Sequence, residues 1–115
     1  MFNIFGKTTE NYEHILCDQL EETLNKSNGK NDFEIIDVRT PGEFHSGHIR
    51  DAKLFNLMDP AFTKKIHQLD PDRTYYVYCR SGSRSMTACR VMAEAGFKNL
   101  YNVKFGLMGW QGELV

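Results

Sequence analysis

The fold is decided by one stretch of the chain, TYYVYCRSGSRS, which covers residues 74–85. Its first five residues, Thr74–Tyr78, are all β-branched or aromatic, which is typical of a strand buried on both faces. Beyond the stretch, apolar residues from Arg84 to Ala95 recur at the spacing of one helix face, and Gly96 stands where a helix commonly ends. The sequence therefore predicts a strand, a short polar loop and a helix of about three turns.

Strand-like and helix-like segments alternate along the rest of the chain. Further strands are expected over residues 12–16, 33–38, 52–57 and 100–103, and further helices over residues 18–28, 41–47 and 59–68. Two of these helices start with a capping box, Thr40 with Glu43 and Asp18 with Glu21. This order favours the α/β class, a small parallel β-sheet flanked by helices on both faces, with a ligand site at the carboxyl ends of the strands.

Length, charge and composition exclude several classes of protein. A chain of 115 residues fits a single domain, residues 1–115, and its 14 basic and 15 acidic side chains argue against nucleic acid or an anionic membrane as a partner. No segment approaches the roughly 20 apolar residues of a membrane helix, and the first residues lack the features of a signal peptide, so we expect a cytoplasmic protein. The 3 cysteines form no Cys-x-x-Cys pair, which argues against a disulfide framework and a thiolate zinc site.

Cys79 carries the clearest chemical signal. It follows the predicted strand directly, and a glycine and polar or charged residues separate it from the next helix. Backbone N–H groups of such a loop and the positive end of the helix stabilise an anion, and Arg80 and Arg84 add positive charge. We therefore expect a pKa well below the value of about 8.5 for a free cysteine, and hence a nucleophilic thiolate. Cys89, on the apolar helix face, is expected to pack in the core, and we assign no role to Cys17.

Two motifs resemble those of the rhodanese-like sulfurtransferases in their single-domain form. The first is DVRTPGEF at residues 37–44, which runs into Gly-His-Ile at residues 47–49 and is similar to the family's signature ahead of the catalytic half. The second is CRSGSRS at residues 79–85, which is similar to its active-site loop led by a nucleophilic cysteine. With a Gly-x-x-x-Trp ending at residues 106–110, the likeness spans about residues 10–112. The fold that the family implies matches the α/β prediction.

The resemblance also implies a reaction. The Cys79 thiolate would take the outer sulfur of a donor such as thiosulfate, a polysulfide or a persulfide, and would pass it to cyanide or a thiol from a cysteine persulfide. The loop amides would stabilise the terminal sulfur, and Arg80 would help to hold an anionic donor. No cofactor or metal is implied, and we expect a monomer whose partners are small sulfur anions and thiol or protein acceptors. Arg84 is expected to brace the loop through a carboxylate of Asp37 or Glu43.

The candidate site residues follow from the loop and the first motif. They are Cys79 as the catalytic residue, Arg80, Ser81, Gly82, Ser83, Arg84 and Ser85 in the loop, and Asp37, Arg39 and Glu43 as structural support.

The chain departs from the family pattern at two turns. Arg50 and Asp51 stand where the family usually has Pro-Gly, so we expect the backbone to turn differently there. Phe105 replaces the first of two paired glycines near the end, which places a bulky ring close to the expected rim of the site.

Two alternative functions stay open. The domain could be a sulfur carrier or binding module with little turnover of small molecules, which an assay with a small thiol would separate from a sulfurtransferase. A cysteine-dependent phosphatase or arsenate reductase is the less favoured alternative, because those enzymes need a Cys-x5-Arg loop around a tetrahedral anion. Here Cys79 and Arg84 have Cys-x4-Arg spacing, and no aspartic acid stands nearby to act as a general acid.

Overall fold

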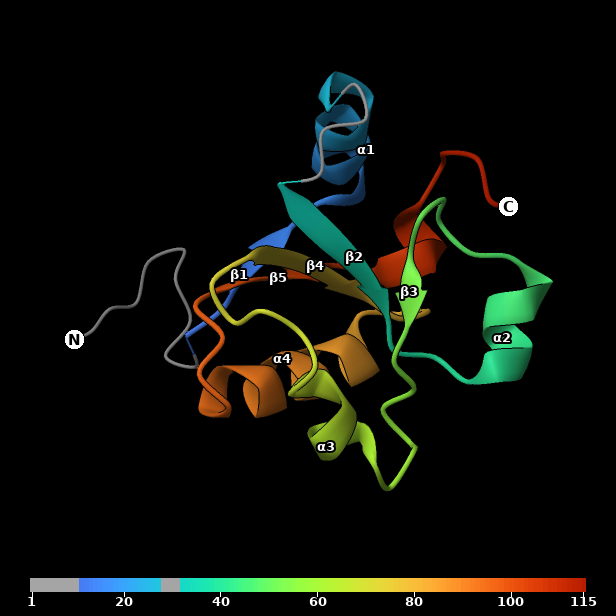
Figure 1. Cartoon of the computed structure of the whole chain (residues 1–115). Helices are drawn as coiled ribbons and strands as arrows, with labels where there is room; N and C mark the ends of the chain where they lie inside the picture. Colours follow the sequence, from blue (N-terminus) through green and yellow to red (C-terminus); the bar gives the residue numbers. More distant parts are fainter. Residues whose placement is uncertain (1–10, 28–31) are drawn as a thin grey trace.

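The computed structural model describes residues 11–27 and 32–115, and these form one five-stranded parallel sheet in the order β1-β5-β4-β2-β3 (Figure 1). The strands are β1 (Glu13–Ile15), β2 (Phe33–Asp37), β3 (Lys53–Leu54), β4 (Thr74–Tyr78) and β5 (Asn99–Val103). The helices are α1 (Cys17–Lys26), α2 (Pro41–Ser46), α3 (Phe62–Ile66) and α4 (Ser83–Glu94), followed by the 3₁₀ helix η1 (Gly106–Gly109). The predicted α/β class with helices on both faces of the sheet is confirmed.

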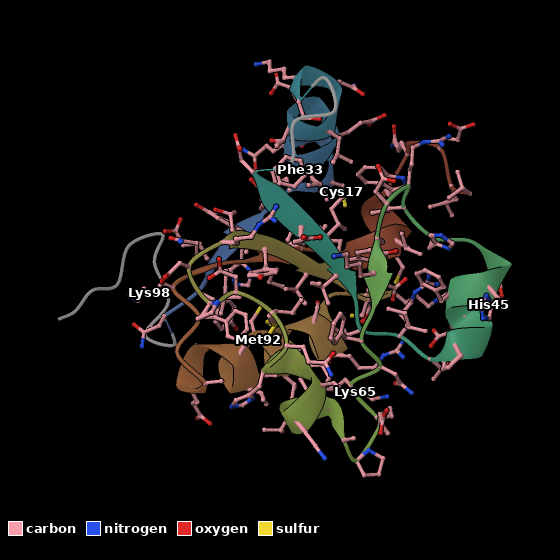
Figure 2. The ribbon with its side chains drawn as sticks, viewed as in Figure 1. Cys17, Phe33, His45, Lys65, Met92 and Lys98 are labelled. Carbon is pink, nitrogen blue, oxygen red and sulfur yellow. The ribbon has the colours of Figure 1, made fainter. Side chains whose placement is uncertain are left out.

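The core consists of two layers, one on each face of the sheet. α3 and α4 cover one face, and α1 and the C-terminal segment lie on the other (Figure 1). The central strand β4 supplies both layers because its side chains alternate: Tyr75 and Val77 pack toward α3 and α4, whereas Tyr78 packs with residues of α1. Figure 2 shows Met92 of α4 in the first layer and Cys17 of α1 in the second. The apolar run of β4 is therefore buried on both faces, as predicted.

The local signals around α2 and α4 gave the correct helix starts and ends. Thr40 Oγ1 accepts a hydrogen bond from the Glu43 amide at 3.3 Å, and Glu43 Oε1 accepts one from the Thr40 amide at 3.1 Å, so the predicted capping box is present. α4 ends at Glu94, and Gly96 follows with φ of 100°, in the left-handed region that favours glycine.

The prediction that Asp18 caps α1 is wrong. The helix begins at Cys17, and its first free amide, that of Leu16, donates to Gln19 Oε1 at 2.9 Å. The reason is the position of β1, which ends at Ile15 and leaves one residue before the helix. Asp18 lies in the first turn, where its charge still favours the positive end of the helix.

Two predicted elements are shorter in the structure. The strand expected over residues 52–57 is reduced to β3, which pairs with the last two residues of β2. Beyond it the amides of Phe55 and Leu57 still donate to the carbonyls of Asp37 and Val38, at 2.8 and 3.0 Å. The helix expected over residues 59–68 is reduced to Phe62–Ile66. The residues from Asp59 to the start of the helix form a turn instead. The Asp59 side chain accepts a hydrogen bond from the Ala61 amide at 2.9 Å, and the Asp59 carbonyl accepts one from the Phe62 amide at 2.9 Å.

The turn at Arg50 and Asp51 does not need the different backbone path that we expected. Asp51 itself adopts the left-handed conformation that glycine favours, with φ of 69°, and the Ala52 amide closes the turn on the Ile49 carbonyl at 3.0 Å. Aspartate tolerates this conformation better than most residues.

Across residues 11–27 and 32–115, no helix combines the length and the apolar character needed to cross a membrane.

Candidate functional site

Cys79 lies at the carboxyl end of the central strand, at the entrance to the loop that leads into α4. Its sulfur accepts hydrogen bonds from the amide of Gly82 at 3.1 Å and the amide of Ser85 at 3.4 Å, and the Ser85 hydroxyl lies 3.5 Å away. Gly82 makes this curvature possible because its φ of 98° turns the chain back toward the sulfur immediately before the helix. The loop therefore surrounds one sulfur atom with donors.

These donors overcome the effect of burial on Cys79. Cys79 has no exposed surface, and burial by itself raises the pKa of its thiol. Hydrogen bonds from the Ser85 hydroxyl and from the amides of Ser85, Gly82 and Ser81 act in the opposite direction and are together stronger, so the pKa lies below the ordinary cysteine value. The thiolate is the favoured form relative to a free cysteine.

The other two cysteines show what burial does without such a loop. Cys89 is also fully buried, and desolvation raises its pKa to about 12. Burial likewise raises the pKa of Cys17, whose sulfur contacts the Gly106 carbonyl at 3.2 Å. All three cysteines are buried, so Cys79 differs from the other two in the groups that its sulfur contacts.

Glu43 supplies the carboxylate that braces Arg84. Arg84 Nη1 donates to Glu43 Oε1 at 2.8 Å and Arg84 Nη2 donates to Oε2 at 3.0 Å, so the pair is bidentate. The Arg84 guanidinium lowers the pKa of Glu43 from 4.5 to about 2. The pair connects α2 to the first turn of α4, and it fixes the loop between Cys79 and the helix.

Asp37 does not contact Arg84 but forms a separate buried pair with Arg39. Arg39 Nη2 donates to Asp37 Oδ2 at 2.7 Å and to the Gly47 carbonyl at 2.7 Å. The guanidinium also lies 5.7 Å from the centre of the Tyr78 ring. The Asp37–Arg39 pair thus holds the segment after β2 close to the end of β4, next to the start of the Cys79 loop.

The segment after β5 forms a second support, which sequence reasoning did not assign. The amides of Leu107 and Met108 donate to the carbonyls of Cys79 and Arg80, both at 3.0 Å. Gly106 makes this approach possible, because a Cβ atom there would lie 2.3 Å from the Cys79 carbonyl oxygen. The Gly-x-x-x-Trp ending was the available signal, but nothing in it indicates which backbone the glycine approaches.

Phe105 stands beside the loop, as expected of a residue at the rim. A Cβ atom on Gly82 would lie 3.0 Å from the Phe105 amide nitrogen, and the Phe105 side chain is 56% exposed. Its φ of 70° lies in the left-handed region that favours glycine. Its ring therefore faces solvent next to the loop rather than filling it.

The remaining loop residues point outward. Arg80, Ser81 and Ser83 are exposed, and Ser85 is fully buried beneath them. Sequence reasoning missed the buried partner of Ser85: its hydroxyl donates to Oδ1 of Asn102 on β5. The part of the chain that the structure describes contains no group of three His, Cys, Asp or Glu side chains able to hold a metal ion.

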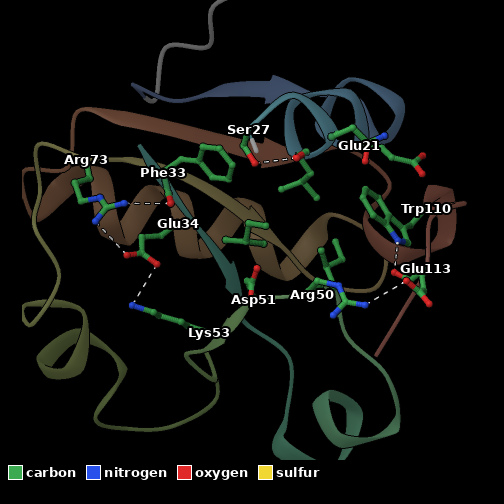
Figure 3. Close-up of a pocket in the computed structure, with 14 residues that line it drawn as sticks. Glu21, Ser27, Phe33, Glu34, Arg50, Asp51, Lys53, Arg73, Trp110 and Glu113 are labelled. Carbon is green, nitrogen blue, oxygen red and sulfur yellow. Dashed lines mark hydrogen bonds and ion pairs between the residues drawn. The ribbon is translucent and has the colours of Figure 1, made fainter. Parts of the chain in front are cut away.

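A cavity of about 700 Å³ lies on the α1 face, away from Cys79 (Figure 3). None of the predicted site residues lines it. Ion pairs mark its two ends, Arg50 with Glu113 at 3.3 Å and Lys53 with Glu34 at 3.2 Å. Trp110 lies at its wall and is half-buried.

Comparison with known proteins identifies the family of this chain. The model of the rhodanese-like domain matches residues 17–113. The chain belongs to the rhodanese-like domain family.

Relatives and solved structures of this family cover most of the chain. A Bacillus subtilis protein described as "Putative sulfurtransferase YtwF" is 42% identical over 79 residues, 69% of this chain and 74% of its own length. The thiosulfate sulfurtransferase GlpE of Shewanella oneidensis is 30% identical over 99 residues, 86% of this chain and 92% of its own. The crystal structure of a rhodanese-like domain protein from Staphylococcus aureus has a TM-score of 0.74 at 28% identity, covering 87% of this chain and 91% of that one.

Replacing Gly106 by alanine tests the support behind the rhodanese loop. We expect Gly106→Ala to lower the free energy of unfolding by about 3 kcal/mol, because the new Cβ would lie within 2.8 Å of backbone atoms of Cys79 and Arg80. Gly42→Ala is the matched control: no atom lies within 4 Å of its Cβ position, and in a helix the change should stabilise by about 0.5–1 kcal/mol. Urea unfolding measures both, and equal effects at the two positions would contradict the assigned contact.

The Glu43–Arg84 pair predicts a dependence of stability on pH. Because the pKa of Glu43 is about 2 in the folded protein and 4.5 ordinarily, the pair contributes above pH 4.5, and the contribution is lost as the pH falls toward 2. We expect Glu43→Gln to cost about 1 kcal/mol at neutral pH and much less at pH 2, as measured by urea unfolding. Glu22→Gln, in an exposed helical pair with Lys26, should change little at either pH, and a constant Glu43 effect across this range would refute the assignment.

Proposed function

We propose that this protein is a sulfurtransferase that moves a sulfane sulfur from a donor such as thiosulfate, a polysulfide or a persulfide to a thiophilic acceptor through a persulfide on Cys79. One observation carries the proposal. The Cys79 sulfur is completely buried, and yet its pKa is lowered, because the amides of Gly82 and Ser85 and the Ser85 hydroxyl surround it. A nucleophile with fixed backbone donors around it is what two-step transfer through a covalent intermediate requires.

The reaction consists of two balanced displacements. The Cys79 thiolate attacks the outer sulfur of thiosulfate, the S–S bond of the donor breaks, and sulfite leaves with the electron pair. The negative charge now lies on the outer sulfur of the Cys79 persulfide. An acceptor thiolate attacks that outer sulfur, the persulfide S–S bond breaks, and the Cys79 thiolate is restored. Because the first product leaves before the acceptor reacts, ping-pong kinetics follow.

The loop geometry supports a donor that presents a single sulfur atom. Cys79 has no exposed surface, so the donor has to insert its outer sulfur between loop atoms that already lie 3.1–3.4 Å from the Cys79 sulfur. The exposed Arg80 at the start of the loop can pair with the anionic remainder of the donor.

Contacts of Arg84 count against the phosphatase alternative. A phosphate-binding loop needs its arginine to donate to the oxygens of the substrate. Here Arg84 gives Nη1 and Nη2 to Glu43, and it stands at the shorter Cys-x4-Arg spacing. Sulfur transfer does not need that donor, since the terminal sulfur is held by backbone amides.

The central test is intact-protein mass spectrometry after incubation with thiosulfate or polysulfide. We expect the wild-type protein to gain one sulfur atom that a phosphine reductant removes, and Cys79→Ser to gain none. Cys17→Ser is the control, because the buried Cys17 has a raised pKa and its sulfur faces a carbonyl. A sulfur retained by Cys79→Ser, or lost in Cys17→Ser, would refute the proposed nucleophile.

One observation keeps the sulfur-carrier function as a second candidate. Two apolar side chains beside the loop are largely exposed, Phe105 at 56% and Met108 at 70%, and such residues suit docking of a protein acceptor. Turnover with a small thiol separates the two functions. A sulfurtransferase with small acceptors should release sulfide continuously from thiosulfate and dithiothreitol, whereas a carrier should keep its persulfide and show a single burst.

A further inference from the structure

A chain of hydrogen bonds leads from the Cys79 sulfur, at the end of the central strand β4, to the edge strand β1. The sulfur lies 3.5 Å from the Ser85 hydroxyl, the Ser85 hydroxyl donates to Asn102 Oδ1, and Asn102 Nδ2 lies 3.2 Å from Nδ1 of His14. The sheet register places the last two residues side by side, since His14 of β1 pairs with Asn102 of β5. Ser85 and Asn102 are buried and His14 is exposed, so the chain connects the site to solvent.

The Ser85 hydroxyl has one proton and two neighbours that can accept it. The contacts of the hydroxyl with Asn102 Oδ1 and with the Cys79 sulfur therefore compete for this proton, whereas the backbone amides of Gly82 and Ser85 donate to the sulfur in either case. A thiol in this arrangement can donate its own S–H to Ser85 Oγ, and every group in the chain then has a partner. A thiolate, by contrast, is stabilised when the Ser85 hydroxyl donates its proton to the sulfur.

We propose that Asn102 is a positioning residue that sets the direction of the Ser85 hydroxyl and thereby the fraction of Cys79 that is thiolate. The inference rests on the proposed role of Cys79 as a nucleophile. In the thiol state the bonds run from sulfur to Ser85, from Ser85 to Asn102 Oδ1, and from Asn102 Nδ2 to His14. In the thiolate state the Asn102 carboxamide turns by half a rotation, so that Nδ2 donates to Ser85 Oγ and the hydroxyl donates to the sulfur.

The change between the two states is balanced. The proton of the Cys79 thiol passes to water. Asn102 Oδ1 now faces His14, and the exposed imidazole changes tautomer: it gives its Nε2 proton to water, takes one up at Nδ1 and donates that one to the oxygen. One proton is released in total, so the change depends on pH. No covalent bond other than these N–H and S–H bonds forms or breaks. Because an amide carries a donor and an acceptor on one rotatable group, asparagine satisfies both states, whereas aspartate or leucine satisfies one of them.

The ionisable groups around this network come from several elements. They are Arg84 and Cys89 on α4, Asp37 on β2, Tyr78 on β4, Glu43 on α2, His14 on β1, and Tyr12 just before β1. Ion pairs occupy Arg84 and Asp37, and burial raises the pKa values of Cys89 and Tyr78.

Opposite substitutions at Asn102 test the inference through the pH dependence of Cys79 alkylation. The rate with iodoacetamide is followed by peptide mass spectrometry across neutral pH, without a sulfur donor, so the result does not depend on sulfur transfer. The carboxylate of Asn102→Asp can only accept a hydrogen bond, so it keeps the Ser85 hydroxyl directed away from the sulfur. We therefore expect the midpoint of Cys79 alkylation at higher pH and about tenfold slower alkylation near neutral pH. Asn102→Leu cannot accept and frees the hydroxyl for the sulfur, so its midpoint should move to lower pH.

A matched control lies on the same strand. Asn99→Asp makes the same chemical change at the exposed start of β5, where the side chain contacts the Asp72 carbonyl, and it should leave the Cys79 midpoint in place. General loosening of the fold would shift both Asn102 variants in the same direction. Equal shifts, or midpoints that match the wild type, would therefore overturn the inference.

A measurement on wild-type protein keeps the test valid if a buried variant fails to fold. The side-chain amide resonances of Asn102 should titrate with the same midpoint as Cys79 alkylation, and that titration should vanish in Cys79→Ala. The amide of Asn99 serves as the internal reference. An Asn102 amide that does not respond to Cys79, or responds equally in Cys79→Ala, would refute the switch.

Discussion

The convergence of backbone amides on one sulfur atom is the interaction on which this structure depends. The central strand ends at Cys79, the chain reverses through the left-handed Gly82, and α4 begins at Ser83. This path leaves the amides of Gly82 and Ser85 without a partner inside the helix, and both point at the sulfur. The loop can hold this shape because it is supported from two sides, by the Arg84–Glu43 pair and by the amides of Leu107 and Met108.

Burial and hydrogen bonding compete at this sulfur, and the competition explains why one cysteine of three is suited to chemistry. Desolvation acts on Cys89 without opposing donors and raises its pKa to about 12. At Cys79 the same desolvation is outweighed by several donors of the loop. Excluding water then becomes useful, since an enclosed persulfide meets fewer competing reactants. The buried Ser85–Asn102 contact extends the same principle, because in a dry environment a single hydroxyl proton matters more.

Much of the fold was predictable where neighbours in sequence make the decisive contacts. The capping box of Thr40 and Glu43 and the left-handed Gly96 gave correct helix limits. Predictions failed where a distant element set the limit. Asp18 has the right chemistry for a cap, but the end of β1 starts the helix one residue earlier. The strand expected to run to residue 57 ends at Leu54, where its pairing with the distant β2 ends, and beyond it the amides of Phe55 and Leu57 still donate to the carbonyls of Asp37 and Val38.

The sequence by itself determined the strand, loop and helix around Cys79, because each of these depends on contacts within a few residues. The tertiary structure alone decided which carboxylate pairs with Arg84. Glu43 is 41 residues away in the chain, and the sequence left Asp37 as an equal candidate. It also decided the role of Gly106, whose missing side chain matters only because the Cys79 carbonyl lies against it. Asn102 reaches Ser85 for the same reason: β5 lies beside β4 and α4 packs on the sheet, and no local pattern records which side chains of a strand and a helix will meet.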